Sequence, residues 1–439
     1  MSCAKNVPSR GSAPIDVPFP HSESGFWAVT RNEDIRYVSR NSEIFSSANG
    51  VSLEPFPLEV ATLTSFFLAM DPPRQTTFRR LVSAAFTPRQ ITRIQSQIEA
   101  NAEEIVDRFA AALASGDDTD DGVDDEVDFV SGCAAALPMR TAWEMLGVPP
   151  HERDRVARAT EAIFGSSDPE YNQGQDPTSF FLEQVAYLHG LGAELARQRR
   201  CEPTADLITG VVQAEIDGQR LSDEQVGAFL VLLSTAGHDT TKQTATHAIK
   251  ALADHPEQKR WLMADFDGRI GTAVDEFVRY ASPVIQFTRT AMVDTVPGGR
   301  QIAAGEKVAL FYRSGNRDER AFVEPAELRL DRTPNPHVGF GGGGVHHCLG
   351  AHVAKAQLTE LLRHVLHRLP RLRVGEPAYL QSHFINGIKR LPVRAGVAVT
   401  WRGTRCRNDP GRLFWRPGMR GPRVRSPRTN MLGKAFSPT

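Results

Sequence analysis

The 439-residue sequence has few cysteines, no long apolar run and almost no net charge. Its five cysteines, at positions 3, 133, 201, 348 and 406, form no paired framework, which excludes a disulfide-stapled domain and favours a reducing compartment. No apolar stretch approaches the roughly 18 residues of a membrane-spanning helix, and the N-terminus lacks the pattern of a secretion signal. We therefore expect a cytoplasmic protein without a membrane anchor.

The net charge of −1 conceals two regions of opposite charge. Residues 401–439 hold nine arginines, one lysine and one acidic residue, whereas residues 1–400 hold 41 basic and 51 acidic residues. The basic tail is rich in Pro and Gly, which is typical of solvated disorder, and nothing in it is typical of a base-recognition module. We expect a loose arm over residues 1–24, one domain over 25–400, and a basic tail over 401–439 that binds no nucleic acid.

The most informative stretch is glycine-rich and reads GFGGGGVHHCLGAH from Gly339 to His352. Four consecutive glycines, Gly341 to Gly344, have no side chains, so they allow the backbone to approach another group closely. Behind them, Cys348 lies where the turn passes into a helix whose leucines recur at helical spacing until Pro370. That position favours the thiolate over the thiol, and a thiolate on rigid backbone beside His346 suits a haem iron ligand.

Two other interpretations of this stretch stay open at this point. A G-x-G-x-x-G pattern begins at Gly339, but no strand-like run precedes it and it lacks the Lys-Ser/Thr of a phosphate loop. A zinc site would combine Cys348 with nearby histidines, although their spacing fits no usual ligand pattern. Those histidines are His337, His346, His347 and His352.

The loop resembles the haem-binding loop of the cytochromes P-450. The resemblance rests on Phe340, the glycine-rich turn, a basic residue two before the cysteine, and the Cys-x-Gly of Cys348 and Gly350. In the commonest form of that pattern the phenylalanine is one residue closer to the cysteine, so we expect a bulge at Val345 or one of the glycines. The resemblance implies haem b with the Cys348 thiolate as the metal ligand. The other loop residues implied at the cofactor are Phe340, Gly341, His346 and Gly350.

A second motif lies in the middle of a long helix that opens at a capping box of Ser222 and Gln225. The segment from Ala236 to Thr241 reads AGHDTT, and glycine and hydroxyl residues are poor helix formers. A threonine there bonds back to a carbonyl one turn earlier and opens the helix to water, which by itself is only a kink. The resemblance implies an oxygen-binding groove against the haem at Ala236, in which Asp239 and Thr240 order water and supply protons.

Arginines in two further motifs match the partners of the haem propionates in this family. The helix MDPPRQTTFRRL carries Arg79, and a strand-like run from Val284 to Thr290 carries Arg289. The resemblance implies that Arg79, Arg289 and His346 neutralise the propionates, because buried carboxylates need such partners. Without the resemblance, the simpler interpretation is that Arg79 and Arg80 are two solvent-exposed arginines.

Glu276 and Arg279, with Arg332 downstream, resemble the Glu-Arg-Arg core that braces the thiolate-side backbone in the family. Taken alone, an i,i+3 pair is a surface contact of a few tenths of a kcal/mol. A buried network of bidentate arginines would instead be rigid. The implied role of these three residues is structural.

Together the motifs span about residues 25–400 in family order. They imply a fold that is mainly α with a small β region, a triangular helical prism with haem between a long central helix and the cysteine-loop helix. The implied activity is that of a haem-thiolate monooxygenase, which inserts one oxygen atom of O2 into an unactivated C–H bond of a sterol side chain, branched lipid or terpenoid. Because the chain shows no flavin or iron–sulfur segment, we expect electrons from a ferredoxin and an NAD(P)H-dependent ferredoxin reductase. A basic face would steer that ferredoxin through Arg74, Arg80, Arg89 and Lys355.

We expect an apolar pocket that holds its ligand mainly by buried area. Its predicted lining residues are Phe66, Phe67, Leu232, Ala236, Val284, Ile285, Phe384 and Ile385. A tailoring oxidase of secondary metabolism and a non-catalytic haem binder are the alternative functions. A peroxygenase or isomerase would usually dispense with the acid–alcohol pair, so Asp239 and Thr240 argue against both.

Overall fold

The computed structural model describes residues 13–15, 25–53, 66–84, 88–114, 126–215 and 217–396, with residues 13–15, 84 and 88–91 described by their backbone alone. The chain divides after Gly396 into two units. The second unit, and with it the predicted basic tail, lies outside the described residues. Of the predicted N-terminal arm, only Ala13–Ile15 is described, as a strand.

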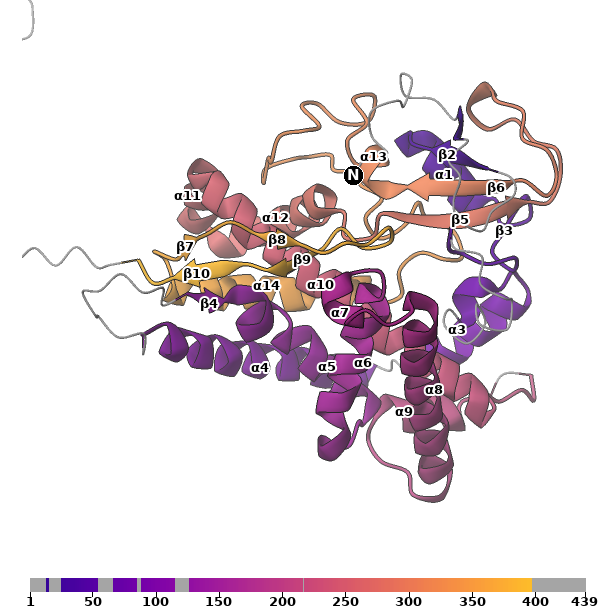
Figure 1. The fold of residues 1–439 in the computed structure, drawn as a ribbon, viewed down its shortest axis with the longest axis horizontal. Coiled ribbons are helices and arrows are strands. Elements are labelled where there is room, and N and C mark those ends of the chain that lie inside the picture. Colours follow the sequence, from indigo (N-terminus) through magenta and orange to yellow (C-terminus); the bar gives the residue numbers. More distant parts are fainter. Residues whose placement is uncertain are drawn as a thin grey trace, which may run out of the picture. The chain divides into compact units, whose positions relative to one another are not determined.

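Helices form most of the described chain (Figure 1). They are α1 (Asn32–Arg40), α3 (Arg74–Ala84), α4 (Pro88–Ala114), α5 (Ala136–Leu146), α6 (Arg153–Gly165), α7 (Pro169–Asn172), α8 (Pro177–Cys201), α9 (Leu207–Gln213), α10 (Asp223–Asp254), α11 (Pro256–Ala264), α12 (Phe266–Ala281), α13 (Tyr312–Gly315) and α14 (Ala351–Arg368). Short 3-10 turns occur at Phe66–Ala69 (η1), Pro150–Glu152 (η3) and Pro297–Gly299 (η4), and a π-helical turn at Val130–Ala134 (η2). Along α4, the apolar residues Ile94, Ile98, Ile105 and Phe109 recur at helical spacing, and their side chains are buried.

The strands are short and form three small sheets within the described part of the chain. They are β1 (Ala13–Ile15), β2 (Phe26–Val29), β3 (Phe45–Ser46), β4 (Val127–Asp128), β5 (Gln286–Ala291), β6 (Lys307–Phe311), β7 (Arg373–Val374), β8 (Ala378–Tyr379), β9 (Ile388–Arg390) and β10 (Pro392–Arg394). The largest sheet has the order β1-β2-β6-β5-β3, with β2 and β6 parallel and the other pairs antiparallel. The two smaller sheets are β4-β10-β7 and β8-β9. A mainly helical fold with a small β region is therefore confirmed.

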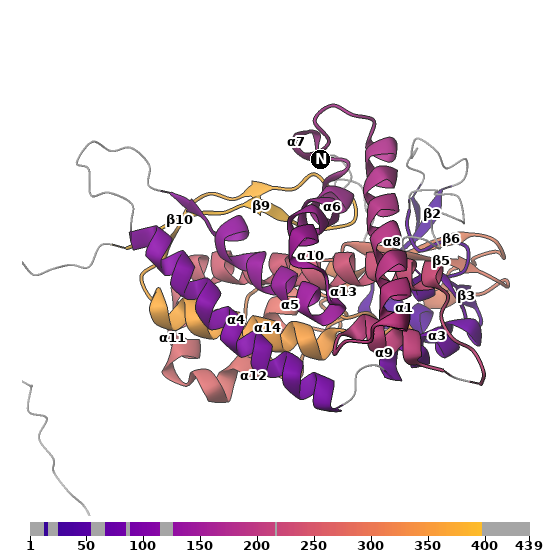
Figure 2. The same ribbon diagram turned by 90° about the horizontal axis from the view of Figure 1, so that it is seen from below.

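The long helix α10 joins two apolar cores through a polar middle. Its first turns, from Val226 to Leu232, pack with α6, α8 and α9, and its last turns, from Ala245 to Leu252, pack with α4, α12 and α14. Figure 2 shows α10 running behind α5 and α8 in this view. The turns between the two cores carry Ser, Thr, His, Asp, Lys and Gln side chains, most of them buried. Ser222 caps the helix through the predicted capping box with Gln225. The middle of α10 thus places a row of polar side chains between the two hydrophobic cores.

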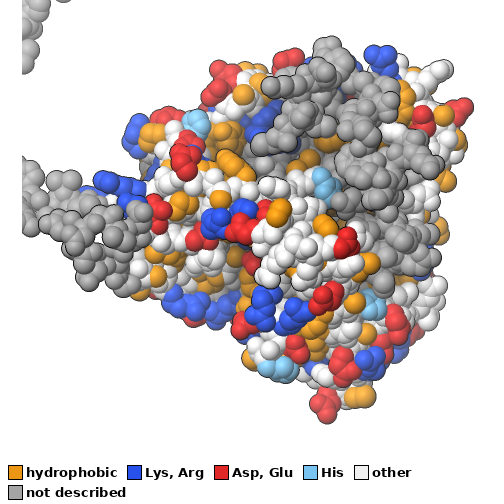
Figure 3. Space-filling model, viewed as in Figure 1, with side chains coloured by type: hydrophobic (Ala, Val, Ile, Leu, Met, Phe, Trp, Pro, Cys, Tyr) orange, Lys and Arg blue, Asp and Glu red, His pale blue; other side chains and the backbone are white. Residues whose placement is uncertain are grey.

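The surface carries charges of both signs. Figure 3 shows Lys and Arg side chains interspersed with Asp and Glu over the visible face of the described residues. None of the described helices combines the length and the apolar character that crossing a bilayer requires.

Candidate functional site

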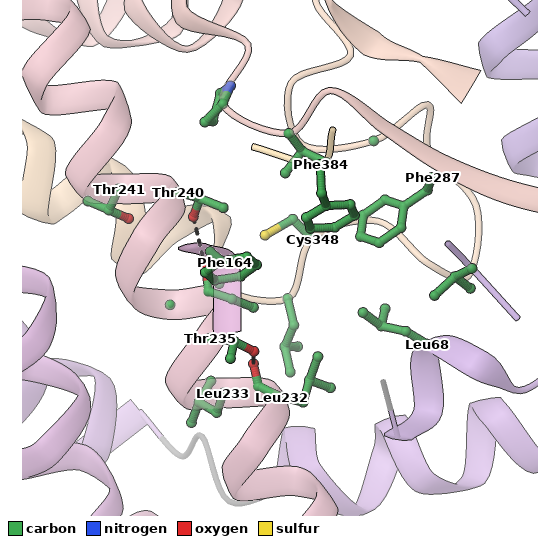
Figure 4. A pocket seen from close by; sticks show the side chains of 18 of the residues that line it. Leu68, Phe164, Leu232, Leu233, Thr235, Thr240, Thr241, Phe287, Cys348 and Phe384 are labelled. Atoms are coloured by element: carbon green, nitrogen blue, oxygen red, sulfur yellow. Dashed lines mark hydrogen bonds between the residues drawn. The ribbon is translucent and has the colours of Figure 1, made fainter. Parts of the chain in front are cut away.

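A cavity of about 510 Å³ lies between the middle of α10 and the loop that carries Cys348. Figure 4 shows the Cys348 side chain pointing into this space, with the threonines of α10 on the facing side. Segments of α6, η1 and β5 and the loop around Phe384 form other parts of its wall. The described lining residues include three cations, Arg79, Arg289 and Lys307, and no Asp or Glu.

Backbone hydrogen bonds and close glycine packing hold the Cys348 loop. The Cys348 N–H donates to the Phe340 carbonyl over 3.0 Å, which closes the loop on itself. Gly342 lies against α1, where a Cβ would come 2.5 Å from Ser39 Oγ, so a larger residue does not fit without movement. The glycine run also holds the backbone angles that glycine tolerates best, with positive φ at Gly341, Gly343 and Gly344.

Two side chains one turn apart on α3 reach the same loop. Gln75 is fully buried, and its amide nitrogen donates to the Val345 carbonyl over 2.8 Å. Arg79 Nη2 donates to the His347 carbonyl over 2.7 Å. The backbone on either side of His346 is therefore tied to α3, which fixes the segment that leads into Cys348.

The acidity of the Cys348 thiol differs from the prediction. Burial raises its pKa, and the opposing effects of the Gly350 N–H and the Arg79 charge do not outweigh that increase. Because α14 begins only at Ala351, Cys348 precedes the helix, and its own N–H is already bonded to the Phe340 carbonyl. Gly350 is the N-cap residue of α14, so the start of the helix does act in the predicted direction, but burial outweighs it. A positive group at the sulfur, such as an iron ion, would be required.

Arg79, Arg289 and His346, predicted at the propionates, all line the cavity. Burial lowers the pKa of both arginines, and Arg289 Nη1 donates to the Thr288 carbonyl over 2.6 Å. His346 Nε2 lies 3.1 Å from Ser47 Oγ. Burial, together with the charges of Arg289 and Arg79, lowers the pKa of His346 to about 3. With these protein groups alone the imidazole is therefore neutral at pH 7, and the two arginines bring the positive charge.

The predicted acid–alcohol pair is divided between two sides of α10. Thr240 lines the cavity, and its hydroxyl donates to the Ala236 carbonyl over 2.9 Å, as the dashed line in Figure 4 shows. Asp239 is buried, is absent from the described cavity lining, and forms an ion pair with Lys242. Adjacent residues on a helix project about 100° apart, so only one of the two can face the cavity directly.

The structure brings Glu276, Arg279 and Arg332 together in a buried cluster. Arg279 donates from Nε and Nη2 to the two Glu276 carboxylate oxygens, both over 2.7 Å. Arg332 Nε adds a third bond to Glu276 over 3.0 Å. The remaining guanidinium nitrogens donate to carbonyl groups between positions 316 and 327. Both arginines thus share the single Glu276 carboxylate and donate otherwise to carbonyl oxygens, and the cluster fixes the backbone between α13 and the Cys348 loop.

Five of the eight residues predicted for the apolar pocket line the cavity, namely Phe67, Leu232, Ala236, Val284 and Phe384. The other three, Phe66, Ile285 and Ile385, are not among its described lining residues. Phe66 packs in the core against Phe78 and Phe229. In extended chain, neighbouring side chains point to opposite faces, so Val284 and Ile285 cannot both line one pocket. Ile385 is buried and pairs with Val284 through an isolated antiparallel bridge.

Several lining residues were missed by the sequence analysis. Phe287 lies two residues before Arg289 in β5, so the alternation of a strand already places both on one face. Thr235, Thr241 and Phe164 also line the cavity, as Figure 4 shows. For Phe164 the sequence holds no comparable signal, because its position depends on how α6 packs on α10.

The cavity fits a flat metal-bearing macrocycle with two carboxylates. It offers the Cys348 thiol, small residues such as Ala236, Gly237 and Gly341 on its walls, and two arginines, the partly exposed Arg79 and the buried Arg289, without a carboxylate among the described lining residues. A zinc cluster is not supported, because no group of three or more His, Cys, Asp or Glu side chains within the described ranges is arranged to hold a metal ion.

Comparison with known proteins identifies the family. The Cytochrome P-450 sequence profile matches residues 184–372. The methyl-branched lipid omega-hydroxylase of Mycobacterium tuberculosis (strain CDC 1551 / Oshkosh) is 38% identical over 380 residues, 86% of each chain. The steroid C26-monooxygenase of Mycolicibacterium smegmatis is 36% identical over 396 residues, 88% of each chain.

The fold matches as well. The structure of a Mycobacterium marinum cytochrome P-450 in complex with pseudoionone superimposes with a TM-score of 0.80 and 50% sequence identity, covering 87% of this chain and 90% of the other. The predictions of fold and enzyme class are confirmed, and the chain belongs to the cytochrome P-450 family of haem-thiolate monooxygenases.

Proposed function

We propose that this enzyme hydroxylates an unactivated C–H bond of a branched lipid, steroid or terpenoid, with haem b bound through Cys348. The observation that carries the proposal is one apolar cavity with Cys348 on one side and the Thr240 hydroxyl on the other. A substrate between these two walls would meet the site of oxygen activation directly.

Cys348 would hold the haem iron, and Arg79 and Arg289 would hold its propionates. Two carboxylates removed from water require cationic partners; the charges of both arginines act on His346, and that of Arg79 acts on Cys348 as well. Arg79 would do so while its Nη2 stays bonded to the loop. When bound, the haem supplies the activation of O2 at its iron.

Thr240 and Asp239 would manage protons in this reaction. Because the Thr240 hydroxyl donates to Ala236, its oxygen lone pairs are free to accept a hydrogen bond from water in the cavity. Asp239, on the adjacent side of α10, would hold a proton for the water that Thr240 orders. Phe164, Phe287 and Phe384 exclude bulk water from the same space.

The substrate class follows from the lining and from the relatives. The cavity has many aromatic and aliphatic residues and a few hydroxyl groups, so it would hold its ligand by area with few polar contacts. Two relatives are named for branched lipids and steroids, and a third is bound to pseudoionone. We therefore expect a largely apolar molecule with a branched or terpenoid chain.

Electrons would come from a ferredoxin with its NAD(P)H-dependent reductase. Arg74 and Arg80 are exposed on α3, while Lys355 is partly used by an ion pair with Asp275 at 2.6 Å. The side chain of Arg89 lies outside the described residues. Rising salt should slow electron transfer from an acidic ferredoxin, and a salt-independent rate would contradict this steering. The cytoplasmic location stays a prediction.

The test is turnover under 18O2 with a ferredoxin, its reductase, and three substrates: a methyl-branched fatty acid, a sterol with an intact side chain, and pseudoionone. We expect one labelled oxygen atom per product and NAD(P)H consumption that depends on substrate. A haem-loaded protein that consumes no electrons with any of them would instead be a non-catalytic haem binder. Product without label would rule out monooxygenation.

A further inference from the structure

The cavity has a third cation that the haem does not account for. Its described lining residues include Arg79, Arg289 and Lys307 but no carboxylate. In the proposed enzyme the two arginines would meet the two haem propionates, and His346 is neutral at pH 7 with the protein groups alone. The Lys307 ammonium is then left without a negative partner among the described lining residues. A largely apolar cavity with one such cation suits a ligand with a single negative charge.

The strand register separates Lys307 from Arg289. In the antiparallel pair of β5 and β6, Arg289 lies opposite Val308, and Thr290 lies opposite Lys307. Residues directly opposite each other share a face of the sheet, and successive residues alternate between faces. Lys307 and Arg289 therefore leave the sheet on opposite faces, although both line the cavity. This arrangement argues against one propionate bound by both residues.

A short polar segment lies over the face that carries Lys307. Thr288 shares this face, because the residue opposite Lys307 follows Thr288 by two positions in β5. The Thr288 N–H donates to the Val51 carbonyl over 2.9 Å, and its hydroxyl lies 3.2 Å from the Ser52 carbonyl oxygen. Residues 49–52 also line the cavity. Together with Lys307 they form a polar end of a cavity whose other walls are mostly apolar.

The Lys307 ammonium is short of partners. Its Nζ lies 3.5 Å from the Ser52 carbonyl oxygen, which is the long limit of a hydrogen bond. Burial lowers the pKa of Lys307, and no charged group among the described residues opposes that effect. The buried Lys242, by contrast, has Asp239 as its partner. Because an ammonium has three N–H donors, at least two of those of Lys307 remain for a ligand.

We propose that Lys307 binds the carboxylate of the substrate, and that the enzyme acts on an apolar acid with a methyl-branched or terpenoid chain. The ammonium would donate to the carboxylate at the polar end of the cavity. The apolar chain would fill the part that reaches Cys348 and Thr240, so that oxygen is inserted at a carbon far from the carboxylate. Lys307 determines specificity and takes no part in the chemistry. The inference rests on the proposed function and narrows its substrate class from neutral esters and sterols to acids.

The test compares a methyl-branched fatty acid with its methyl ester in titrations of the substrate-induced spin-state shift of the holoenzyme. Lys307→Met removes the charge at similar length, so the ratio of acid affinity to ester affinity should fall about tenfold or more. Lys307→Arg should retain most of the ratio because it keeps a charged donor. The matched control is Lys259→Met. Lys259 is a half-buried lysine on α11 that donates to the Pro370 carbonyl over 2.8 Å and is absent from the described cavity lining.

Two results would overturn the carboxylate site. The first is an unchanged ratio in Lys307→Met. The second is an equal loss of affinity for acid and ester together with release of haem on gel filtration, because that outcome assigns Lys307 to a propionate. The spin-state titration needs no turnover. If the acid binds through Lys307 while no substrate gives 18O-labelled product, the proposed function fails and the carboxylate site stands.

Discussion

Phe164 of α6 and Phe384 of the loop after β8 stack face to face, with ring centroids 6.0 Å apart and ring planes 3° from parallel. Phe384 also meets Phe287 of β5 edge-on, with centroids 5.2 Å apart. Nearby, the Gln381 N–H donates to Asp168 Oδ2 over 3.0 Å, which ties the same loop to the start of α7. Three segments far apart in the sequence thus build one aromatic wall of the cavity (Figure 4).

Removing the ring at the centre of this wall should weaken substrate binding. Phe384→Ala deletes two aromatic contacts, each contributing about 0.5–1.5 kcal/mol beyond the buried area. We expect roughly tenfold weaker binding in titrations of the substrate-induced spin-state shift. Tyr379→Ala removes an exposed ring from the adjacent strand β8 and should bind like the parent protein. Equal affinity of both variants would show that the wall does not contact substrate.

Cys348→Ser should abolish the thiolate signature of the reduced, CO-bound haem. Serine keeps the size of the side chain but offers no sulfur ligand to the iron. Cys201→Ser is the matched control, because Cys201 is free and exposed at the end of α8. An unchanged absorption band in Cys348→Ser would contradict the ligand assignment.

Thr240→Ala should divert electrons from product to peroxide. The substitution removes the one cavity-lining hydroxyl that bonds to Ala236, and with it a partner for water near the reaction site. Removing such a proton-handling group costs about 100-fold or more in general acid–base catalysis. Peroxide and product are measured per NAD(P)H consumed. Thr240→Ser should retain most of the coupling, and fully coupled turnover in Thr240→Ala would remove the proposed role.

Arg279→Lys should destabilise the fold. The lysine cannot make the two parallel bonds to Glu276 or reach the carbonyl groups of Asn316 and Pro325 at once. Breaking a buried pair costs about 3–5 kcal/mol in the free energy of unfolding, which urea titration measures. Arg363→Lys, in a largely exposed pair with Asp267, should cost under about 1 kcal/mol. Similar values for both variants would contradict a bracing role.

His247 should make the folded state sensitive to mild acid. Burial lowers its pKa to about 4, and the neutral ring bonds through Nε2 to the Asn386 carbonyl. Between about pH 6.5 and about pH 4 the unfolded chain therefore binds a proton that the folded chain does not, so the free energy of unfolding falls as the pH falls. The contribution is on the order of 1–3 kcal/mol.

Urea unfolding at pH 7 and pH 5 checks this. His247→Gln should reduce the difference between the two values, because the other buried histidines, such as His346, still contribute to it, whereas His151→Gln, at an exposed position, should keep it. The same slope in His247→Gln as in the parent protein would rule out His247 as its source.

Local patterns in the sequence predict much of this fold. The capping box at Ser222 and Gln225 marks the start of α10, and the apolar spacing after Pro88 gives α4 its observed bounds. In the apolar segment that begins at Leu391, the described residues form a strand, β10, only at Pro392–Arg394. β3 is only two residues long and pairs with β5. Two residues are too few to show the side-chain alternation that predicts a strand from sequence.

The candidate site is harder to predict from local sequence patterns, because it depends on packing between distant segments. Asp239 and Lys242 are visible as an i,i+3 pair, but Glu161 joins them only because α6 lies on α10. The acidity of Cys348 likewise depends on burial, which its neighbours in sequence do not reveal. By contrast, the alternation of side chains along an extended segment can be read from the sequence alone. It is enough to remove Ile285 from the predicted cavity lining and to add Phe287 to it.

The contact of Gly342 and Gly344 with α1 has a consequence for how the protein is made. The support of the sulfur-bearing loop is a helix that the ribosome releases early, while the loop itself emerges near the end of synthesis. A nascent chain therefore cannot shape the Cys348 loop until this late segment meets α1. Capture of the porphyrin should accordingly be among the last events of biogenesis, after translation of the loop and its supporting arginine cluster is complete.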